Sequence, residues 1–356
     1  FIEANNDFSK FQLFAGKISS LLNPITYIII NFAIITIIYL GGLEVNSGII
    51  ENGDVVAQYN YMSQILVELI KFASFTITIN KALASGKRVF SVLEVKNTQY
   101  FPEASNIENN SDIAIEMVNC ALRYPKNQEN AIEGINLTIK KGETVGIIGA
   151  TGSGKTTLVS LLARYYDATE GSIKLFGNDI NQYSKKDLRE TVGIVLQNSV
   201  LFKGSIKDNI LMANTKSDEE ILKALEISQA LEVVENRENQ LNAEVFQGGS
   251  NFSGGQKQRL SIARTLLSNP KILVLDDSAS ALDYLTDKKL RDAIKKLNND
   301  LALLIISSRC ASIINADKIV VLDEGKIVGI DTHENLLKTC QIYQEIYYSQ
   351  TEKEGI

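Results

Sequence analysis

The sequence predicts an α/β domain with a parallel sheet, preceded by an all-α segment of two membrane-spanning helices. Three observations lead to this prediction. A glycine-rich segment stands between an apolar run suited to a strand and a run suited to a helix. A second apolar run, Lys271–Asp277, ends in two carboxylates, as a buried strand of a parallel sheet can. Residues 18–43 contain no charged residue, and a stretch of this length can cross a bilayer.

The predicted membrane segment covers residues 1–95, with spans at about 18–43 and 55–83. A buried helix of a soluble domain is the alternative for the first span, although such helices usually show a polar face. The second span is less apolar because it contains Glu68 and Lys71, which can pair on a helix. This pair lies either inside a bundle or beyond the bilayer.

Charge predicts how this segment is oriented. Lysine and arginine flank the two spans, whereas the loop between them carries Glu44, Glu51 and Asp54 and no basic residue. The positive-inside rule therefore places both ends of the segment in the cytoplasm and the loop outside.

The polar, asparagine-rich residues 96–112 are predicted to form a linker. The α/β domain follows, with its phosphate-binding loop at Gly149–Thr156, which fits the pattern G-x-x-x-x-G-K-[ST]. Glycines let backbone N–H groups converge on phosphate oxygens, and the positive end of the following helix dipole faces the same anion. We therefore expect Lys155 to reach the β- and γ-phosphates and Thr156 to ligate Mg²⁺. The nucleotide-binding residues predicted here are Gly149, Thr151, Gly152, Ser153, Gly154, Lys155, Thr156 and Thr157.

Hydrophobic periodicity places the remaining elements of this domain. Strands are expected at 113–118, 135–139, 143–148, 172–177, 271–277 and 301–308, with a final hairpin at 318–328. The stretch 207–249 has a helical pattern, with a capping box formed by Ser217 and Glu220. A further helix is expected from Gly254 to about Ser268, where Asn269-Pro270 ends it.

Composition narrows the classes of function. The 356 residues suffice for two or more domains, and a net charge of −6 argues against a general nucleic-acid-binding surface. Three cysteines without metal-ligand spacing indicate a reducing compartment. A single histidine, His333, excludes a histidine-based metal site.

The segment Phe252–Leu260, just before the acidic strand, contains Ser253, Gly254, Gly255 and Gln256. With this segment and the phosphate loop together, residues 113–350 resemble the ATPase domain of an ABC transporter, an α/β P-loop NTPase with a helical subdomain. The two spans resemble the last two of six in an exporter whose membrane and ATPase parts share one chain. The resemblance implies about four further spans before Phe1, and a multi-pass protein of the cell membrane with its ATPase domain in the cytoplasm.

The resemblance assigns further roles. Tyr124 matches the aromatic residue that stacks on adenine, and Gln197 matches the glutamine that touches Mg²⁺ and couples to the membrane part. Asp276 matches the carboxylate of the Mg²⁺ site, and Asp283 lies in the loop that crosses to the opposite subunit. ATP and Mg²⁺ are the implied ligands, with Thr156, Gln197 and Asp276 around the metal.

The same family pairs two such domains head to tail. Ser253 and Gly255, at a helix N-terminus, then cap the γ-phosphate held by the phosphate loop of the partner. The implied partner is a second half-transporter. The transported substrate is not identified by any of these motifs.

The sequence departs from the family pattern at two catalytic positions. Asp277 stands where a glutamate is usual, and Ser308 stands where a histidine is usual. A carboxylate set back by about 1 Å can cost roughly a hundredfold in rate. Both departures affect the ATP site built by this chain, whereas the Ser253–Gln256 segment is intact. This asymmetry favours the degenerate-site subunit of a heterodimeric, multidrug-type exporter.

Three other interpretations remain at this point. A homodimeric exporter could hydrolyse ATP with Asp277. A soluble ABC-type ATPase acting on DNA or ribosomes is disfavoured by the uncharged run 18–43 and by the acidic composition. A regulatory ATP-binding module without transport is the third.

Overall fold

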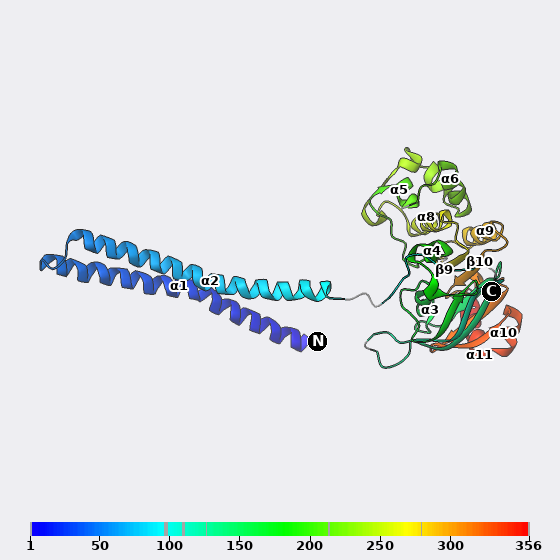
Figure 1. The fold of residues 1–356 in the computed structure, drawn as a ribbon, viewed down its shortest axis with the longest axis horizontal. Coiled ribbons are helices and arrows are strands. Elements are labelled where there is room, and N and C mark those ends of the chain that lie inside the picture. The colour runs from blue at the N-terminus through cyan, green and yellow to red at the C-terminus, as the bar shows by residue number, and fades with distance from the viewer. Residues whose placement is uncertain are drawn as a thin grey trace. The chain divides into compact units, whose positions relative to one another are not determined.

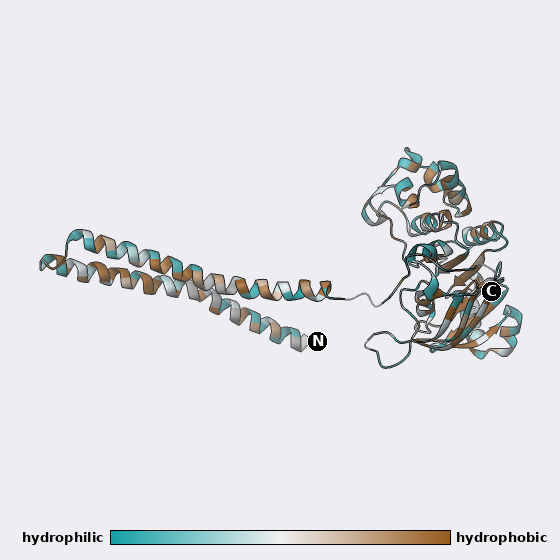
Figure 2. Cartoon of the chain, viewed as in Figure 1, coloured by the Kyte–Doolittle hydropathy of each residue, from teal (hydrophilic) through white to brown (hydrophobic). Residues whose placement is uncertain are grey.

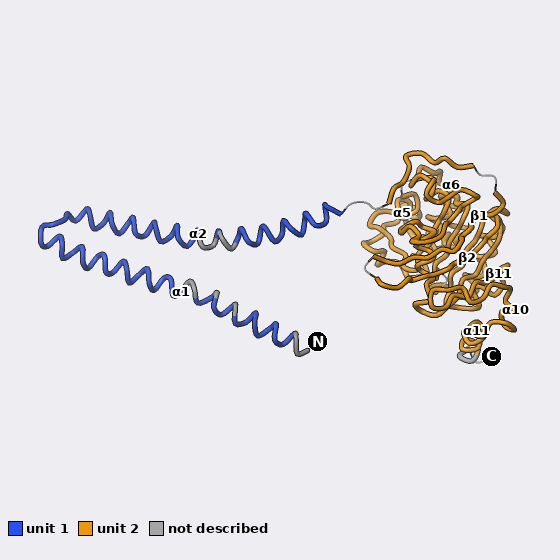
Figure 3. Tube along the Cα trace, turned by 60° about the horizontal axis from the view of Figure 1, so that its bottom comes forward, with its two compact units in different colours: residues 1–97 blue, residues 98–356 orange. Residues whose placement is uncertain are grey.

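The computed structural model describes residues 2–95, 99–108, 111–125, 127–212, 214–278 and 280–354, apart from some helix side chains. The chain separates into two compact units, residues 1–97 and 98–356, which are coloured separately in Figure 3. The first unit is helical, and the second combines sheets with helices.

The first unit is a pair of long helices, α1 (Ile2–Asn46) and α2 (Asn52–Leu93). A capping box between Glu51 and Asp54 starts α2. The predicted pair within α2 is present, with Lys71 Nζ 2.6 Å from Glu68 Oε1.

Among the helices that the structure describes, one segment, Pro24–Asn46 of α1, is long and apolar enough to cross a bilayer (Figure 2). Large apolar side chains such as Phe32 and Ile35 are exposed along it, as expected of a lipid-facing surface. The predicted span at 55–83 lies within α2 but does not pass the same test, so a second crossing stays a prediction.

The central sheet of the second unit carries the strands that end at the candidate site. Its order is β12-β11-β3-β10-β9-β6, and all neighbours are parallel except β11 and β12. Strand β10 and its two neighbours, β3 and β9, are buried along their whole length and are mostly apolar, as is typical of parallel strands covered on both faces. The strands are β3 (Thr144–Ile148), β6 (Val192–Val195), β9 (Ile272–Asp276), β10 (Ala302–Ile306), β11 (Lys318–Asp323) and β12 (Lys326–Asp331).

A second, antiparallel sheet shares its core with the central one. Its order is β2-β1-β4-β5. One hydrophobic cluster joins side chains of both sheets to those of α3 (Lys155–Leu162), including Ile115, Leu158 and Leu304. The strands are β1 (Ile113–Leu122), β2 (Ile132–Lys140), β4 (Glu170–Leu175) and β5 (Asn178–Asp179).

The helices between β6 and β9 form a subdomain with its own hydrophobic core, and Figure 1 shows α5, α6 and α8 gathered at one end of the second unit. The predicted capping box is confirmed, since Ser217 N–H donates to Glu220 Oε2 (2.9 Å) and Glu220 N–H donates to Ser217 Oγ (3.3 Å). The region also contains one short strand pair, β7 (Gly204–Ser205) with β8 (Glu244–Val245). The helices are α5 (Ile206–Leu211), α6 (Asp218–Ile227), α7 (Leu231–Glu235) and α8 (Gly254–Leu267).

The remaining helices cover the central sheet and its surroundings. Tyr343 is buried in the hydrophobic cluster that includes Cys310 and Ile313. The last helix therefore packs against the chain segment that follows β10. These helices are α4 (Lys185–Thr191), α9 (Tyr284–Lys295), α10 (His333–Thr339) and α11 (Gln341–Glu354).

The predicted linker, 96–112, is described at 99–108 and 111–112, and the rest of it lies outside the described residues. Its described part is fastened to the second unit by Arg164, which directly follows the C-cap of α3 and is 3% exposed. Arg164 donates to the carbonyl of Tyr100 (2.8 Å) and to Asp167 (2.8 Å), and its guanidinium lies 4.2 Å from the centre of the Phe101 ring. Two further hydrogen bonds join Ser105 to Asp187 and to the Ser184 amide.

We predict that Arg164→Ala lowers the stability of the second unit by about 2–4 kcal/mol, because it removes a buried charge-assisted network. Thermal unfolding of the complete protein would show a fall in Tm of roughly 5–15 °C. The matched control is Arg189→Ala. Arg189 also donates to the end of α3, at the Ala163 carbonyl, but from an exposed position. An equal loss in both variants would contradict a special role for the buried arginine.

Candidate nucleotide-binding site

The phosphate loop connects β3 to α3, and its glycines are required by its geometry. Gly152 and Gly154 have φ values of +86° and +102°, a region that side chains disfavour. A Cβ on Gly149 would lie 2.1 Å from the carbonyl oxygen of Leu322. The loop therefore passes so close to β11 that a side chain at this position is excluded.

A cleft of about 640 Å³ opens beside this loop, at the carboxyl ends of β3, β9 and β10. Ligand crevices of open parallel sheets lie at this edge. The structure brings most of the predicted site residues together in the cleft. Those that line it are Thr151, Gly152, Gly154, Lys155, Thr156, Thr157, Gln197, Asp276, Asp277 and Ser308.

Lys155 is held by the loop from which it projects. Its ammonium group donates to the carbonyls of Gly149 (2.6 Å) and Ala150 (2.8 Å). Burial lowers the pKa of Lys155, whereas the negative charges of Asp277 and Asp276 oppose this shift. The lysine is thus a half-buried donor already placed at the loop, where an anionic ligand can accept from it.

Asp276 ends β9 and is 7% exposed. Burial raises the pKa of this carboxyl and the charge of Asp277 raises it further, while Lys155 acts in the opposite direction. A buried carboxylate beside a second carboxylate is destabilising unless a cation offsets the charge. The exposed Thr156 hydroxyl lines the same cleft, and together these oxygen groups fit the ligands that Mg²⁺ prefers.

Asp277 differs from its predicted strand conformation. The strand ends at Asp276, and Asp277 turns into the left-handed region with φ of +45°, while its N–H still donates to the Ile306 carbonyl (2.8 Å). Its Oδ2 accepts from Gln197 Nε2 (3.0 Å), and its buried Oδ1 has no hydrogen-bond partner in the described structure. The unpaired oxygen is a group that a ligand or a water could satisfy.

Ser308 follows β10 and faces the cleft. The buried Ser307 precedes it, and the Ser307 hydroxyl accepts from the Arg309 amide (2.9 Å). His333 begins α10, and its Nδ1 lies 2.8 Å from the Tyr343 hydroxyl. Among the described residues, His333 is not part of the cleft lining. It therefore does not take the place of the histidine that Ser308 replaces in the family pattern.

Tyr124 lies next to the cleft rather than in its lining. Its hydroxyl donates to Thr157 Oγ1 (3.1 Å), and its ring meets the edge of Tyr166 at 5.0 Å between centroids. These two contacts fix the ring at the rim of the site. Gly149 and Ser153, which are also predicted to bind nucleotide, lie in the phosphate loop but do not line the described cleft.

Sequence reasoning missed residues that the fold brings in from other segments. Asn130 and Ala131 precede β2, and Glu324 and Gly325 form the turn between β11 and β12; all four line the cleft. A Cβ on Gly325 would lie 2.7 Å from the Ala131 carbonyl, so the two segments touch there. The Glu-Gly turn was visible in the sequence, but nothing local connects it to the phosphate loop.

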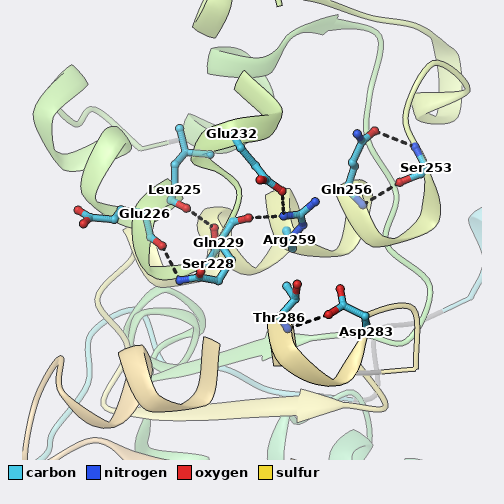
Figure 4. Close-up of polar contacts among 10 residues, drawn as sticks. All are labelled: Leu225, Glu226, Ser228, Gln229, Glu232, Ser253, Gln256, Arg259, Asp283 and Thr286. Carbon is cyan, nitrogen blue, oxygen red and sulfur yellow. Dashed lines mark hydrogen bonds and ion pairs between the residues drawn. The ribbon is translucent and has the colours of Figure 1, made fainter. Parts of the chain in front are cut away.

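The Ser253–Gln256 segment forms a second, separate feature. Ser253 caps α8, since Gln256 N–H donates to Ser253 Oγ (3.3 Å) and Ser253 N–H donates to Gln256 Oε1 (3.0 Å), as Figure 4 shows. A Cβ on Gly255 would lie 2.8 Å from the Ala281 carbonyl, so this helix end packs against the segment before α9. Asp283 caps α9 through the Thr286 amide (3.0 Å), a hydrogen bond that lowers the Asp283 pKa. Within the described chain, none of the residues of this segment lines the cleft.

Comparison with known proteins agrees with this geometry. Residues 132–280 match the family model described as ABC transporter. An uncharacterized ABC transporter ATP-binding protein of Mycobacterium tuberculosis (strain ATCC 25618 / H37Rv) is 34% identical over 99% of this chain and 61% of its own length. An ATP-dependent lipid A-core flippase of Desulfotalea psychrophila is 36% identical over 92% of this chain and 57% of its own.

The fold is also similar to that of a solved structure, a bacterial Atm1-family ABC exporter with ATP bound. The two share a TM-score of 0.70 and 30% identity, over 85% of this chain and 53% of that one. The chain thus spans about three fifths of the length of the curated relatives named above.

We predict that Asp276→Asn stabilises the protein at neutral pH in the absence of nucleotide. The folded-state pKa of Asp276 lies above its unfolded value of about 3.9, so its ionisation costs stability as pH rises through the folded pKa. The gain in Tm should therefore be present at pH 7.5 and disappear as the pH falls toward about 4. The same variant should lose most of the extra stabilisation that Mg²⁺ adds to bound ATP.

A control of opposite sign is Asp208→Asn. Hydrogen bonds from the Ser205 hydroxyl and the Ser205 N–H hold the pKa of Asp208 below its usual value. Its ionised form therefore stabilises the folded state, and its removal should lower Tm at pH 7.5. The interpretation fails if Asp276→Asn is destabilising like the control.

Proposed function

We propose that this chain, whose residues 132–280 form an ABC transporter domain, is the ATP-binding part of an exporter subunit that couples ATP to transport across a membrane. One observation carries the proposal. The phosphate loop, the two carboxylates Asp276 and Asp277 at the end of β9, Gln197 and Ser308 all line one cleft at the carboxyl ends of the parallel strands. This arrangement supplies an anion cradle and a cation site side by side, as ATP with Mg²⁺ requires.

In this proposal, Gly149–Thr157 surround the phosphates and Lys155 donates to the β- and γ-phosphates. Tyr124 stacks on adenine at the rim. Thr156, Gln197 and Asp276 are the residues that would hold Mg²⁺, which would supply neutralisation of phosphate charge. Asp277 orients and deprotonates the attacking water, with Gln197 Nε2 holding one of its carboxylate oxygens at 3.0 Å. Ser308 contacts the γ-phosphate.

Ser253, Gly254, Gly255 and Gln256 serve the ATP site of a second subunit in this proposal, because the capped start of α8 is a ready-made anion site. Asp283 and its loop lie against the same helix end and cross to that subunit. The separation of this segment from the chain's own cleft supports a head-to-tail dimer, in which each ATP lies between the phosphate loop of one subunit and the segment of the other that corresponds to Ser253–Gln256.

We favour a heterodimer with a different half-transporter. Asp277 and Ser308 replace the longer side chains of the family pattern, so the site built by this chain hydrolyses ATP poorly. The second candidate is a homodimeric exporter, which is favoured by the placement of the Asp277 carboxylate in the cleft beside Gln197. The two candidates share fold and ligand and differ in turnover.

The proposed location is the cell membrane, with several crossings and the ATPase domain in the cytoplasm. The apolar segment Pro24–Asn46 supports a membrane location and disfavours a soluble ABC-type ATPase. No substrate class follows from the residues of this chain, because the relatives' names cover different cargoes.

We predict that the full-length protein, reconstituted in lipid without a partner, binds ATP. It should hydrolyse ATP far more slowly than the pair formed with its partner does. In the pair, Asp277→Glu combined with Ser308→His should raise turnover at this site by tenfold or more, because both changes restore reach toward the γ-phosphate. Asp323→Glu, at the end of β11 in the same sheet, is the matched control and should have no effect.

Turnover of the unpaired wild type at roughly 1–10 s⁻¹ would instead favour the homodimer. Absence of nucleotide binding by the wild type, in a folded sample, would refute the proposal as a whole.

A further inference from the structure

The last helix reaches into the segment that carries Ser308. The side-chain amide of Gln350, on α11, makes two hydrogen bonds with backbone atoms on either side of Arg309. Its Nε2 donates to the Ser308 carbonyl (2.7 Å), and its Oε1 accepts from the Cys310 amide (2.9 Å). Both polar ends of one half-buried carboxamide therefore hold the chain directly after β10.

The helix that carries Gln350 is itself firmly placed. Tyr343 on α11 is fully buried in the cluster that includes Cys310 and Ile313, and its hydroxyl lies 2.8 Å from His333 Nδ1. Ile346 and Tyr347 pack against the same cluster one turn later. Gln350 is thus presented from a rigid support, which reduces the entropy lost in holding the loop.

The held segment connects to the reacting groups of the cleft. Arg309 donates to the Ser280 carbonyl (3.4 Å), and the Ser280 hydroxyl donates to the Asp277 carbonyl (2.8 Å). On the other side, the Ser307 amide donates to the Ile147 carbonyl (3.0 Å) of β3. Displacing residues 307–310 would therefore move Ser308 and disturb the backbone beside Asp277.

Backbone position matters more for Ser308 than it would for a longer residue. A serine hydroxyl is placed by a single torsion with three staggered wells, so it cannot reach out to compensate for a shifted loop. A misplacement of about 1 Å suffices to lose a contact to a transferring group. Whatever fixes the Ser308 backbone consequently fixes what the hydroxyl can touch.

We infer that Gln350 is a positioning residue for the ATP site, which holds the Ser308 segment so that the hydroxyl can contact the γ-phosphate. This inference rests on the proposed ATP binding. It adds a residue from the C-terminal helix to a site otherwise built by the phosphate loop and the ends of β9 and β10.

The test is the preference of this chain's own site for a triphosphate over a diphosphate. The complete transporter in lipid is photolabelled on this chain with an azido-adenine nucleotide at low temperature, and the label is competed with AMP-PNP or with ADP. We expect Gln350→Ala to reduce the preference for AMP-PNP roughly three- to tenfold, with the affinity for ADP unchanged. Ser308→Ala should do the same.

A double-mutant cycle separates positioning from general stability. If Gln350 acts through Ser308, the variant with both substitutions should be no worse than Ser308→Ala alone. Gln350→Glu provides a second variant, because it keeps an acceptor for the Cys310 amide but replaces the donor to the Ser308 carbonyl, and it should resemble Gln350→Ala. Gln341→Ala is the matched control, since Gln341 lies on α11 and donates only to the exposed Glu345 among the described contacts.

Several results would overturn the inference. These are an unchanged AMP-PNP preference in both Gln350 variants, an equal weakening of AMP-PNP and ADP, an unchanged preference in Ser308→Ala, or losses that multiply in the double variant. A wild-type chain that is folded but takes no label refutes the proposed function itself, which is a distinct outcome.

Discussion

One ammonium group and two carboxylates share a partly buried cleft, and the architecture of the second unit follows from keeping them there. Lys155 begins α3 directly after the loop that follows β3, whereas Asp276 and Asp277 stand at the end of β9, one strand beyond β10 in the sheet. Their mutual attraction offsets only part of the cost of burial, as the opposed shifts in the Lys155 and Asp276 pKa values indicate. The site is thus better satisfied with a ligand that brings both negative phosphates and a divalent cation.

Local sequence patterns predicted the parts of the fold in which each residue depends on its neighbours along the chain. The glycine loop, the buried strands after Glu143 and Lys271, the capping box at Ser217 and the helix that starts at Gly254 are of this kind. Each is determined by residues within a few positions, through backbone freedom, apolar periodicity or reciprocal caps. The structure confirmed the α/β fold class and placed most of the predicted site residues around one cleft.

Contacts between distant segments could not be predicted in this way. The left-handed turn at Asp277 depends on pairing with β10, and the Ala131–Gly325 contact joins two loops almost two hundred residues apart. The docking of the linker on Arg164 and the grip of Gln350 on the Ser308 segment likewise depend on packing between remote elements. A glutamine or an arginine carries no pattern of its own, so only the assembled fold reveals what it touches.

The three serine capping boxes of the helical subdomain, at the starts of α5, α6 and α8, differ in one respect. At Ser205 and Ser217, the third residue is a carboxylate that accepts from both the serine N–H and the serine O–H. At Ser253, the third residue is the uncharged Gln256, whose oxygen accepts from the N–H. The Ser253 hydroxyl accepts from the Gln256 amide, and among the described residues no carboxylate accepts its proton. The capping box of this helix start is therefore uncharged, unlike the two others, and the proton of the Ser253 hydroxyl is not bound within the box.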